Sequence, residues 1–280
     1  MALTFLHASD IHFGKRFDPE AAAAFLRFLP EVSPDLLIIS GDFTQRAKVR
    51  EYRAARAFLE SLPPIPLVVT PGNHDVPLYR VWERILAPHR NYRRFISREL
   101  NGVTRIAGAT VVHLDSTAPH RAIVNGRIRD SQLRFAQRAF QGAEDEDIRV
   151  LVIHHNLVPA PDDRREKVLS GHGRCLKAFS EMGVELIVAG HLHRGFIVRL
   201  HGVNPEGAGS RPMTLVHTGT TTSTRGRVGE RGRNSLNVIR VSKEWIEVIP
   251  HLFRKGSGSF NPSGSEGIPR ESLQGEGGGS

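Results

Sequence analysis

Short apolar runs alternate with amphipathic segments over roughly the first two thirds of the chain. The apolar runs predict buried strands at 2–9, 35–40, 65–69, 103–107, 109–115, 148–153 and 185–189. The segments between them have helical periodicity and predict helices at 19–29, 48–61, 78–100, 130–141 and 174–181. Asp18 followed by Pro19 is typical of a helix start, and Pro88 predicts a kink that divides the third helix in two.

The pattern changes after Gly195. Short β-like runs follow one another there without intervening helices, at 195–201, 213–218, 234–241 and 244–250, with loops predicted at 202–211 and 219–233. Alternating β and α units followed by an all-β section predict an α/β fold, a four-layer α-β-β-α sandwich of two mixed sheets flanked by helices. We expect one catalytic domain over 1–254. Residues 255–280 are rich in Gly and Ser, which predicts a disordered tail or linker.

Composition narrows the possible partners. Lys and Arg total 38 against 29 for Asp and Glu, which gives a net charge of +9, and most of the basic residues are arginine. Arginine suits phosphate and carboxylate groups, although a solvated basic surface explains the surplus equally well. The single cysteine, Cys175, excludes an internal disulfide and a thiolate zinc site. No apolar run approaches the roughly 20 residues of a membrane span, and we expect a cytoplasmic protein.

Five short polar motifs follow predicted strands. They are Asp10-Ile11-His12, Gly41-Asp42, Gly72-Asn73-His74-Asp75, His154-His155 and Gly190-His191-Leu192-His193. The carboxyl ends of strands are where α/β sheets form their sites, and these side chains suit Mn, Fe, Zn or Co. Residues i and i+2 of an extended segment point to the same side, so Asp10 and His12 should converge, as should His191 and His193. A lone Asp42 could bridge two metal ions.

The order of these motifs resembles the calcineurin-like metallophosphoesterase superfamily over residues 10–193. The resemblance implies two divalent metal ions that share a bridging Asp42 and supply a hydroxide for attack on phosphorus. One ion would be bound by Asp10, His12 and His193, and the other by Asn73, His154 and His191.

The resemblance also implies roles for residues beside the ions. His74 would contact the phosphate and protonate the leaving oxygen, and Asp75 would orient His74. Asn73 would face the substrate, and Arg46 lies where some family members place a phosphate-binding arginine. His155 follows a ligand and is expected to support the site rather than bind metal.

Further segments narrow the substrate. Residues 112–116 and 126–133 resemble class III cyclic nucleotide phosphodiesterases and bacterial glycerophosphodiesterases. Residues 154–159 resemble their H-H-x-x-x-P stretch, with Asn156 where proline is usual. We therefore predict a phosphodiesterase that acts on small phosphodiesters such as cyclic nucleotides.

Other functions stay open at this point. The net charge and Gly14 fit a metal-dependent nuclease, which is not favoured because the capping region of such enzymes is missing. A phosphomonoesterase, or a pyrophosphatase acting on nucleotide or lipid-linked substrates, is a further alternative, although UDP-diacylglucosamine pyrophosphatases typically carry arginine at the position of His74. The basic, aromatic segment 79–100 could contact an anionic membrane. The full ligand set argues against a non-catalytic scaffold, and the sequence leaves the oligomeric state open.

Overall fold

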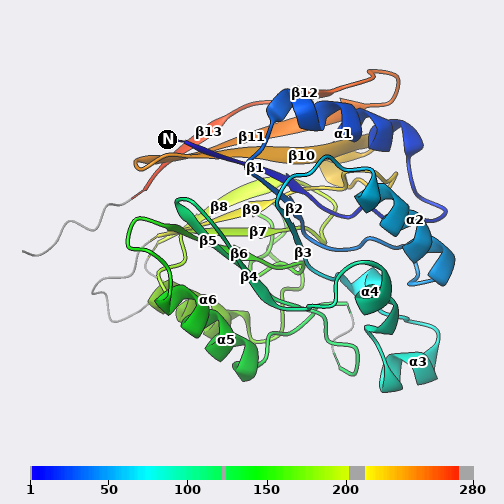
Figure 1. Ribbon diagram of the computed structural model, residues 1–280, viewed down its shortest axis with the longest axis horizontal. Helices are drawn as coiled ribbons and strands as arrows, with labels where there is room; N and C mark the ends of the chain where they lie inside the picture. Colours follow the sequence, from blue (N-terminus) through cyan, green and yellow to red (C-terminus); the bar gives the residue numbers. More distant parts are fainter. Residues whose placement is uncertain (1, 122–123, 202–211, 271–280) are drawn as a thin grey trace, which may run out of the picture.

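Two β-sheets stack face to face with helices on both outer sides (Figure 1). The computed structural model describes residues 2–121, 124–201 and 212–270. The predicted four-layer α-β-β-α sandwich is confirmed. The predicted loop 202–211 lies outside the described residues.

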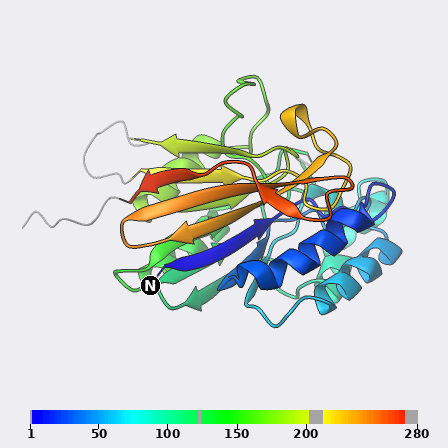
Figure 2. The same cartoon turned by 90° about the horizontal axis from the view of Figure 1, so that it is seen from above.

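The first sheet carries the N-terminal and C-terminal strands. Its order is β12-β11-β10-β1-β2-β3, and β13 also pairs with β11. Figure 2 shows this sheet from above, with the C-terminal strands in orange and red beside β1 in blue. Strands β1, β2 and β3 are parallel, so their carboxyl ends lie at one edge. The bounds are β1 Leu3–Ala8, β2 Leu36–Ile39, β3 Leu67–Val69, β10 Arg233–Val241, β11 Trp245–Arg254, β12 Phe260–Pro262 and β13 Glu266–Pro269.

The second sheet has the order β4-β5-β6-β7-β9-β8. Its inner strands β5, β6, β7 and β9 are parallel, and the outer strands β4 and β8 run antiparallel to their neighbours. The bounds are β4 Gly102–Ile106, β5 Ala109–His113, β6 Ile148–Val152, β7 Leu186–Ala189, β8 Phe196–Leu200 and β9 Met213–His217.

Helices bury an apolar face on the outside of each sheet. α1 (Pro19–Val32) and α2 (Val49–Glu60) pack on the first sheet, and α5 (Asp130–Gln141) and α6 (His172–Glu181) pack on the second. The side chain of Asp18 caps α1 by accepting hydrogen bonds from two backbone N–H groups of its first turn, as the sequence predicts. Cys175 is buried in the cluster beneath α6.

A third apolar cluster fills the space between the sheets. It contains Phe5 and Ile38 from the first sheet and Val111, Val150 and Val188 from the second. The inner strands are covered on both faces, which is why they appear in the sequence as continuous apolar runs. Packing on both faces holds the strand ends rigidly, and these ends position the polar motifs.

The segment 78–100 forms two short helices rather than one long amphipathic helix. α3 spans Val81–Leu86 and α4 spans Arg90–Phe95, so the break predicted at Pro88 is present. α4 buries Tyr92, whereas α3 buries no side chain. α3 is only six residues long, because Pro88 interrupts the helical pattern just after it. A helix this short has little surface to bury.

The first sheet extends beyond the predicted end of the domain at residue 254. β12 and β13 lie within the predicted disordered tail, and both pair with β11. Phe260 and Ile268 are buried, so two well-placed apolar residues are enough to attach this polar segment to a sheet edge. The prediction of disorder is therefore wrong for these strands, and residues 271–280 lie outside the described residues. No helix of the described part is long and apolar enough to cross a membrane.

Candidate metal centre

The five motifs lie together at the carboxyl ends of strands from both sheets. Loops after β1, β2 and β3 carry the first three motifs, and loops after β6 and β7 carry the last two. The third motif forms a single 3-10 turn, Asn73–Asp75. The predicted convergence of the motif residues is therefore seen in the structure.

One group of four ligand atoms comes from Asp10, His12, Asp42 and His193. These atoms all lie within 4.8 Å of one another, and all four residues are buried. Nε2 of His193 lies 3.0 Å from Oδ1 of Asp10, and Nε2 of His12 lies 3.5 Å from the same oxygen. Two imidazoles and two carboxylates converging in this way could hold one divalent ion.

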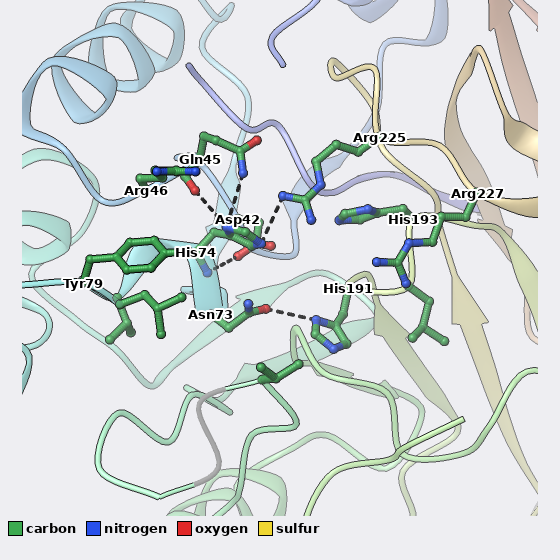
Figure 3. Close-up of a pocket in the computed structure, with 14 residues that line it drawn as sticks. Asp42, Gln45, Arg46, Asn73, His74, Tyr79, His191, His193, Arg225 and Arg227 are labelled. Carbon is green, nitrogen blue, oxygen red and sulfur yellow. Dashed lines mark hydrogen bonds between the residues drawn. The ribbon is translucent and has the colours of Figure 1, made fainter. Parts of the chain in front are cut away.

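A second group lies on the other side of Asp42. Oδ1 of Asn73 lies 3.0 Å from Nδ1 of His191 (Figure 3). The same oxygen lies 3.3 Å from Nε2 of His154. Oδ2 of Asp42 lies 3.4 Å from Nε2 of His154 and 3.6 Å from Nε2 of His12. This one carboxylate oxygen therefore lies between the two groups.

The backbone is left-handed at five of the seven residues of the two groups. The φ angles are 54° at Asp10 and His12, 53° at Asp42, 74° at His191 and 55° at His193. The side chains at i and i+2 do converge, as expected, but the assumption that their backbone is extended is wrong. Left-handed residues other than glycine cost about 1–2 kcal/mol each, and such costs are concentrated at functional sites.

Two glycines allow the loops to approach one another. Gly41 has φ 99°, and a Cβ there would lie 2.5 Å from Nδ1 of His154. A Cβ on Gly72 would collide with Oδ1 and the backbone nitrogen of Asp42. Both positions therefore favour glycine, for a conformational and a steric reason at Gly41 and for a steric reason at Gly72.

Charge in the site is balanced by imidazoles. Burial alone would raise the pKa of Asp10, but His193 and His12 outweigh it and hold that pKa well below the usual range. Burial likewise opposes ionisation of Asp42, and His154 and His74 keep its pKa well below the usual range. Burial would lower the pKa of His154, but Asp42 raises it to about 9. The structure thus retains two ionised carboxylates in its interior.

The donor set fits divalent cations. Oδ1 of Asp10 and Oδ2 of Asp42 are buried and form no hydrogen bond with the described residues. Nδ1 of His154 donates to the carbonyl oxygen of Ser40 at 2.7 Å, and Nδ1 of His12 faces the carbonyl oxygen of Thr44 at 3.3 Å. These bonds direct Nε2 of both rings at the carboxylates, so each Nε2 could bind a metal ion in its deprotonated form, as in metal-binding histidines.

His155 lies beside the second group. Its ligand atom lies within 4.8 Å of those of His154 and His191, and its Nε2 is buried without a hydrogen-bond partner among the described residues. Its Nδ1 lies 2.8 Å from Oγ of Ser116. The supporting role expected for His155 stays a prediction, because its position would allow either role.

His74 lies at the edge of the site. Its Nδ1 donates to the carbonyl oxygen of Gln45 at 2.8 Å, and its Nε2 lies 3.1 Å from Nη1 of Arg225 (Figure 3). Because a carbonyl oxygen only accepts, the tautomer follows, and Nε2 accepts from Arg225. Asn73, His74 and His191 are partly exposed, so this side of the site is open to a substrate.

Asp75 does not orient the imidazole of His74, and that expectation is corrected. Its carboxylate accepts hydrogen bonds from the backbone N–H groups of Phe43, Thr44 and Gly72 and from the hydroxyl of Thr44. The side chain is thus directed into the loop after β2, away from the imidazole. Asp75 connects the loops after β2 and β3, and Gln45 holds the imidazole instead.

A cavity of about 300 Å³ opens over both ligand groups. Arg46 lines it with its guanidinium 5.2 Å from the centre of the Tyr79 ring, and Arg225 and Arg227 line it from the loop after β9. Sequence reasoning found Arg46 but missed Arg225, Gln45 and Tyr79. The arginine-rich composition of 219–233 was the only sequence feature that pointed to Arg225.

Comparisons with known proteins agree with this geometry. The family profile of the calcineurin-like phosphoesterases matches residues 3–195. A probable cyclic nucleotide phosphodiesterase of a Synechococcus species is 29% identical over 70% of this chain and 76% of its own length. A cAMP/cGMP dual specificity phosphodiesterase of Mycobacterium tuberculosis is 28% identical over 73% of this chain and 63% of its own length.

Solved structures show the same fold. A purple acid phosphatase from yellow lupin superposes with a TM-score of 0.68 over 97% of this chain and 54% of its own. The sequence identity is 10%, so this likeness concerns the fold alone.

Proposed function

The chain belongs to the calcineurin-like phosphoesterase family, and we propose that it hydrolyses small phosphodiesters at a centre of two divalent metal ions. The position of Asp42 Oδ2 between two groups of ligand atoms carries this proposal. Asp10, His12 and His193 would hold one ion, and Asn73, His154 and His191 the other. When bound, two such ions acidify a water molecule for attack and neutralise charge on the phosphoryl oxygens.

His74 and Arg225 are the candidates for the remaining chemistry. Arg225 would donate to a phosphoryl oxygen, and this would free Nε2 of His74 from its present contact with the guanidinium. Once free, Nε2 of His74 would take up a proton from solvent, and the resulting imidazolium would deliver that proton to the leaving oxygen while Gln45 holds Nδ1. The contact between Arg225 and His74 beside the ligand groups is consistent with such an exchange, in which the phosphoryl oxygen replaces Nε2 of His74 as the partner of Arg225.

The size and the walls of the first cavity favour a small substrate. Its volume of about 300 Å³ suits one phosphodiester with a small organic group. The ring of Tyr79 beside Arg46 offers a flat surface for a nucleobase. One relative is named a probable cyclic nucleotide phosphodiesterase and another a cAMP/cGMP dual specificity phosphodiesterase, which supports cyclic nucleotides as the first substrates to test.

The test is a substrate screen with Mn²⁺-loaded protein. We expect hydrolysis of bis(p-nitrophenyl) phosphate and of at least one cyclic nucleotide, and none by the Asp42→Asn variant. Phosphomonoesters and single-stranded DNA serve as competing substrates. Exclusive cleavage of phosphomonoesters would contradict the proposal, and so would full activity of Asp42→Asn.

We further propose that α3 makes peripheral contact with an anionic membrane. Trp82 is 77% exposed and Leu86 is 79% exposed, although both are large apolar side chains. The exposed arginines of α4 lie directly after α3 in the chain, and a basic, aromatic segment suits an anionic lipid surface. We expect the wild type to sediment with phosphatidylglycerol vesicles and the Trp82→Ala/Leu86→Ala variant to stay in the supernatant. Equal sedimentation of both proteins, or none of either, would contradict this contact.

A further inference from the structure

A second, more basic cavity adjoins the metal centre. Its volume is about 720 Å³, and it shares Gln45, Arg46, His193, Arg225 and Arg227 with the first cavity. The residues that line only the second cavity are Lys15, Arg16, Lys48, Arg50, Glu51 and Thr224. We call these residues, together with the shared arginines, the basic groove. One groove thus leads away from the ligand groups.

Backbone hydrogen bonds join the three loops that form the basic groove. The loop after β1 is bonded to the loop after β2, since Gln45 N donates to Phe13 O at 2.9 Å. The loop after β1 is also bonded to the loop after β9, since Thr224 N donates to Arg16 O at 2.9 Å. Side chains on loops held in this way start from fixed positions, so the groove is present before any ligand binds.

The charges of the basic groove are not cancelled within it. Seven cationic side chains line it, from Lys15, Arg16, Arg46, Lys48, Arg50, Arg225 and Arg227. Glu51 is its only carboxylate, and that carboxylate accepts from the backbone N–H groups of Arg46 and Lys48 rather than from a cationic side chain. Clustered like charges of this kind attract anionic ligands.

One end of the basic groove lies at the site of reaction. Arg225 is half-buried and reaches Nε2 of His74, and Figure 3 shows its guanidinium directed toward that imidazole. Arg16 and Lys48 are exposed and line the part of the groove that the first cavity does not include. Because the two cavities share lining residues, one ligand could place a phosphodiester at the ligand groups and a further anionic group there.

We propose that the basic groove binds a second phosphate of the substrate, so that the preferred substrates are nucleotide phosphodiesters with a further phosphate. The inference rests on the proposed phosphodiesterase activity and specifies its substrate class. A small diester with a single phosphate needs only the first cavity. A second phosphate would contact Arg16 and Lys48 by charge-assisted hydrogen bonds, which are the strong ones.

Two chromogenic substrates test this inference directly. Thymidine 5′-(p-nitrophenyl phosphate) and its 3′-phosphorylated derivative share the scissile bond and the leaving group, and they differ by one phosphate. We expect the 3′-phosphate to raise kcat/KM about tenfold, which is the worth of one hydrogen bond to a charged group. Raising the salt concentration from about 50 mM to about 500 mM should reduce the preference, since the groove is open to solvent.

Matched variants locate the effect. Arg16→Ala/Lys48→Ala should reduce the preference to less than about twofold. The variant retains the Arg16 carbonyl, which accepts from Thr224 N, and the Lys48 carbonyl, which accepts from backbone N–H groups at the start of α2. Arg134→Ala/Arg138→Ala removes the same charge from α5 and should keep the preference.

Three results would overturn the inference. They are equal kcat/KM for the two substrates, an unchanged preference in Arg16→Ala/Lys48→Ala, or a loss of preference in Arg134→Ala/Arg138→Ala. The proposed function is judged separately, because hydrolysis of the substrate without the 3′-phosphate supports it whatever the preference. Hydrolysis of neither substrate would contradict both.

Discussion

The proposed role of His74 as proton donor rests on Gln45, whose carbonyl oxygen holds one ring nitrogen while the other faces the cavity. We expect His74→Ala to reduce kcat/KM by about 100-fold or more for a cyclic nucleotide, whose leaving alkoxide needs a proton. The loss should be much smaller for bis(p-nitrophenyl) phosphate, because p-nitrophenolate leaves without one. Steady-state kinetics on both substrates check this. Equal losses would assign His74 to binding rather than to proton transfer.

Gly72 is required for steric reasons. Gly72→Ala would force a methyl group against Asp42, and we expect a loss of about 1–3 kcal/mol of stability together with weaker Mn²⁺ binding. Gly173→Ala is the matched control, because a Cβ there meets no atom within 4 Å and the residue lies in α6. Urea unfolding and Mn²⁺ titration measure both effects. A Gly72→Ala protein as stable as Gly173→Ala would contradict the steric account.

At the residue scale, most of the side chains that meet at the two ligand groups could be predicted from the sequence, and a few of those around them could not. Asp10 and His193 stand in short motifs after apolar runs, and such motifs can be recognised without knowing the fold. Arg225 lies in a loop with no motif, and its approach to His74 depends on how three loops are joined. Asp75 shows the opposite error, since adjacency in sequence suggested contact with His74 but the side chain bonds to the neighbouring loop.

At the scale of elements, the apolar runs identified the strands of both sheets, because strands covered on two faces need continuous apolar sequence. The hydrophobic pattern was less informative for elements that bury little apolar surface. β12 and β13 are attached through pairing with β11 and through Phe260 and Ile268, which is too few apolar residues to produce a recognisable pattern. α3 formed as predicted but stayed exposed, which periodicity alone could not reveal.

The strand β5 ends in a histidine that should make the fold sensitive to acid. Burial lowers the pKa of His113 to about 4 from its ordinary 6.5. The unfolded chain therefore takes up this proton first, and stability that is fully present above pH 6.5 is lost as the pH falls toward 4. The loss from this one group is roughly 3 kcal/mol.

His113→Leu tests this sensitivity. Both ring nitrogens of His113 lack hydrogen-bond partners among the described residues, so an apolar side chain should be tolerated. We expect the metal-free variant to lose less stability than the metal-free wild type between pH 7.5 and pH 4.5, as measured by urea unfolding. Parallel losses in the two proteins would show that His113 does not titrate on unfolding.

At the scale of the whole molecule, the sandwich brings strand ends of both sheets to one place. Asp42 comes from the first sheet and His154 from the second, so the site requires both sheets to be docked. Buried carboxylates and left-handed residues make this region costly in the metal-free protein. Bound cations would offset that cost, because a ligand that binds only the folded state stabilises it.

The structure also shows where part of the positive charge of the molecule lies. The net charge of +9 by itself did not distinguish a nucleic acid from a membrane or a small anion. The structure gathers seven of the cationic side chains along the basic groove beside the ligand groups. Loop positions decide this gathering, and composition could not predict it.

The most direct test of the two-metal account is a titration of metal-free protein with Mn²⁺ while the hydrolysis of bis(p-nitrophenyl) phosphate is followed. We predict that activity rises and saturates near about two ions per chain, since each ligand group would hold one ion and both are needed. Asp42→Asn should stay inactive throughout the titration. Full activity at one ion per chain, or no hydrolysis at any Mn²⁺ concentration, would contradict the account.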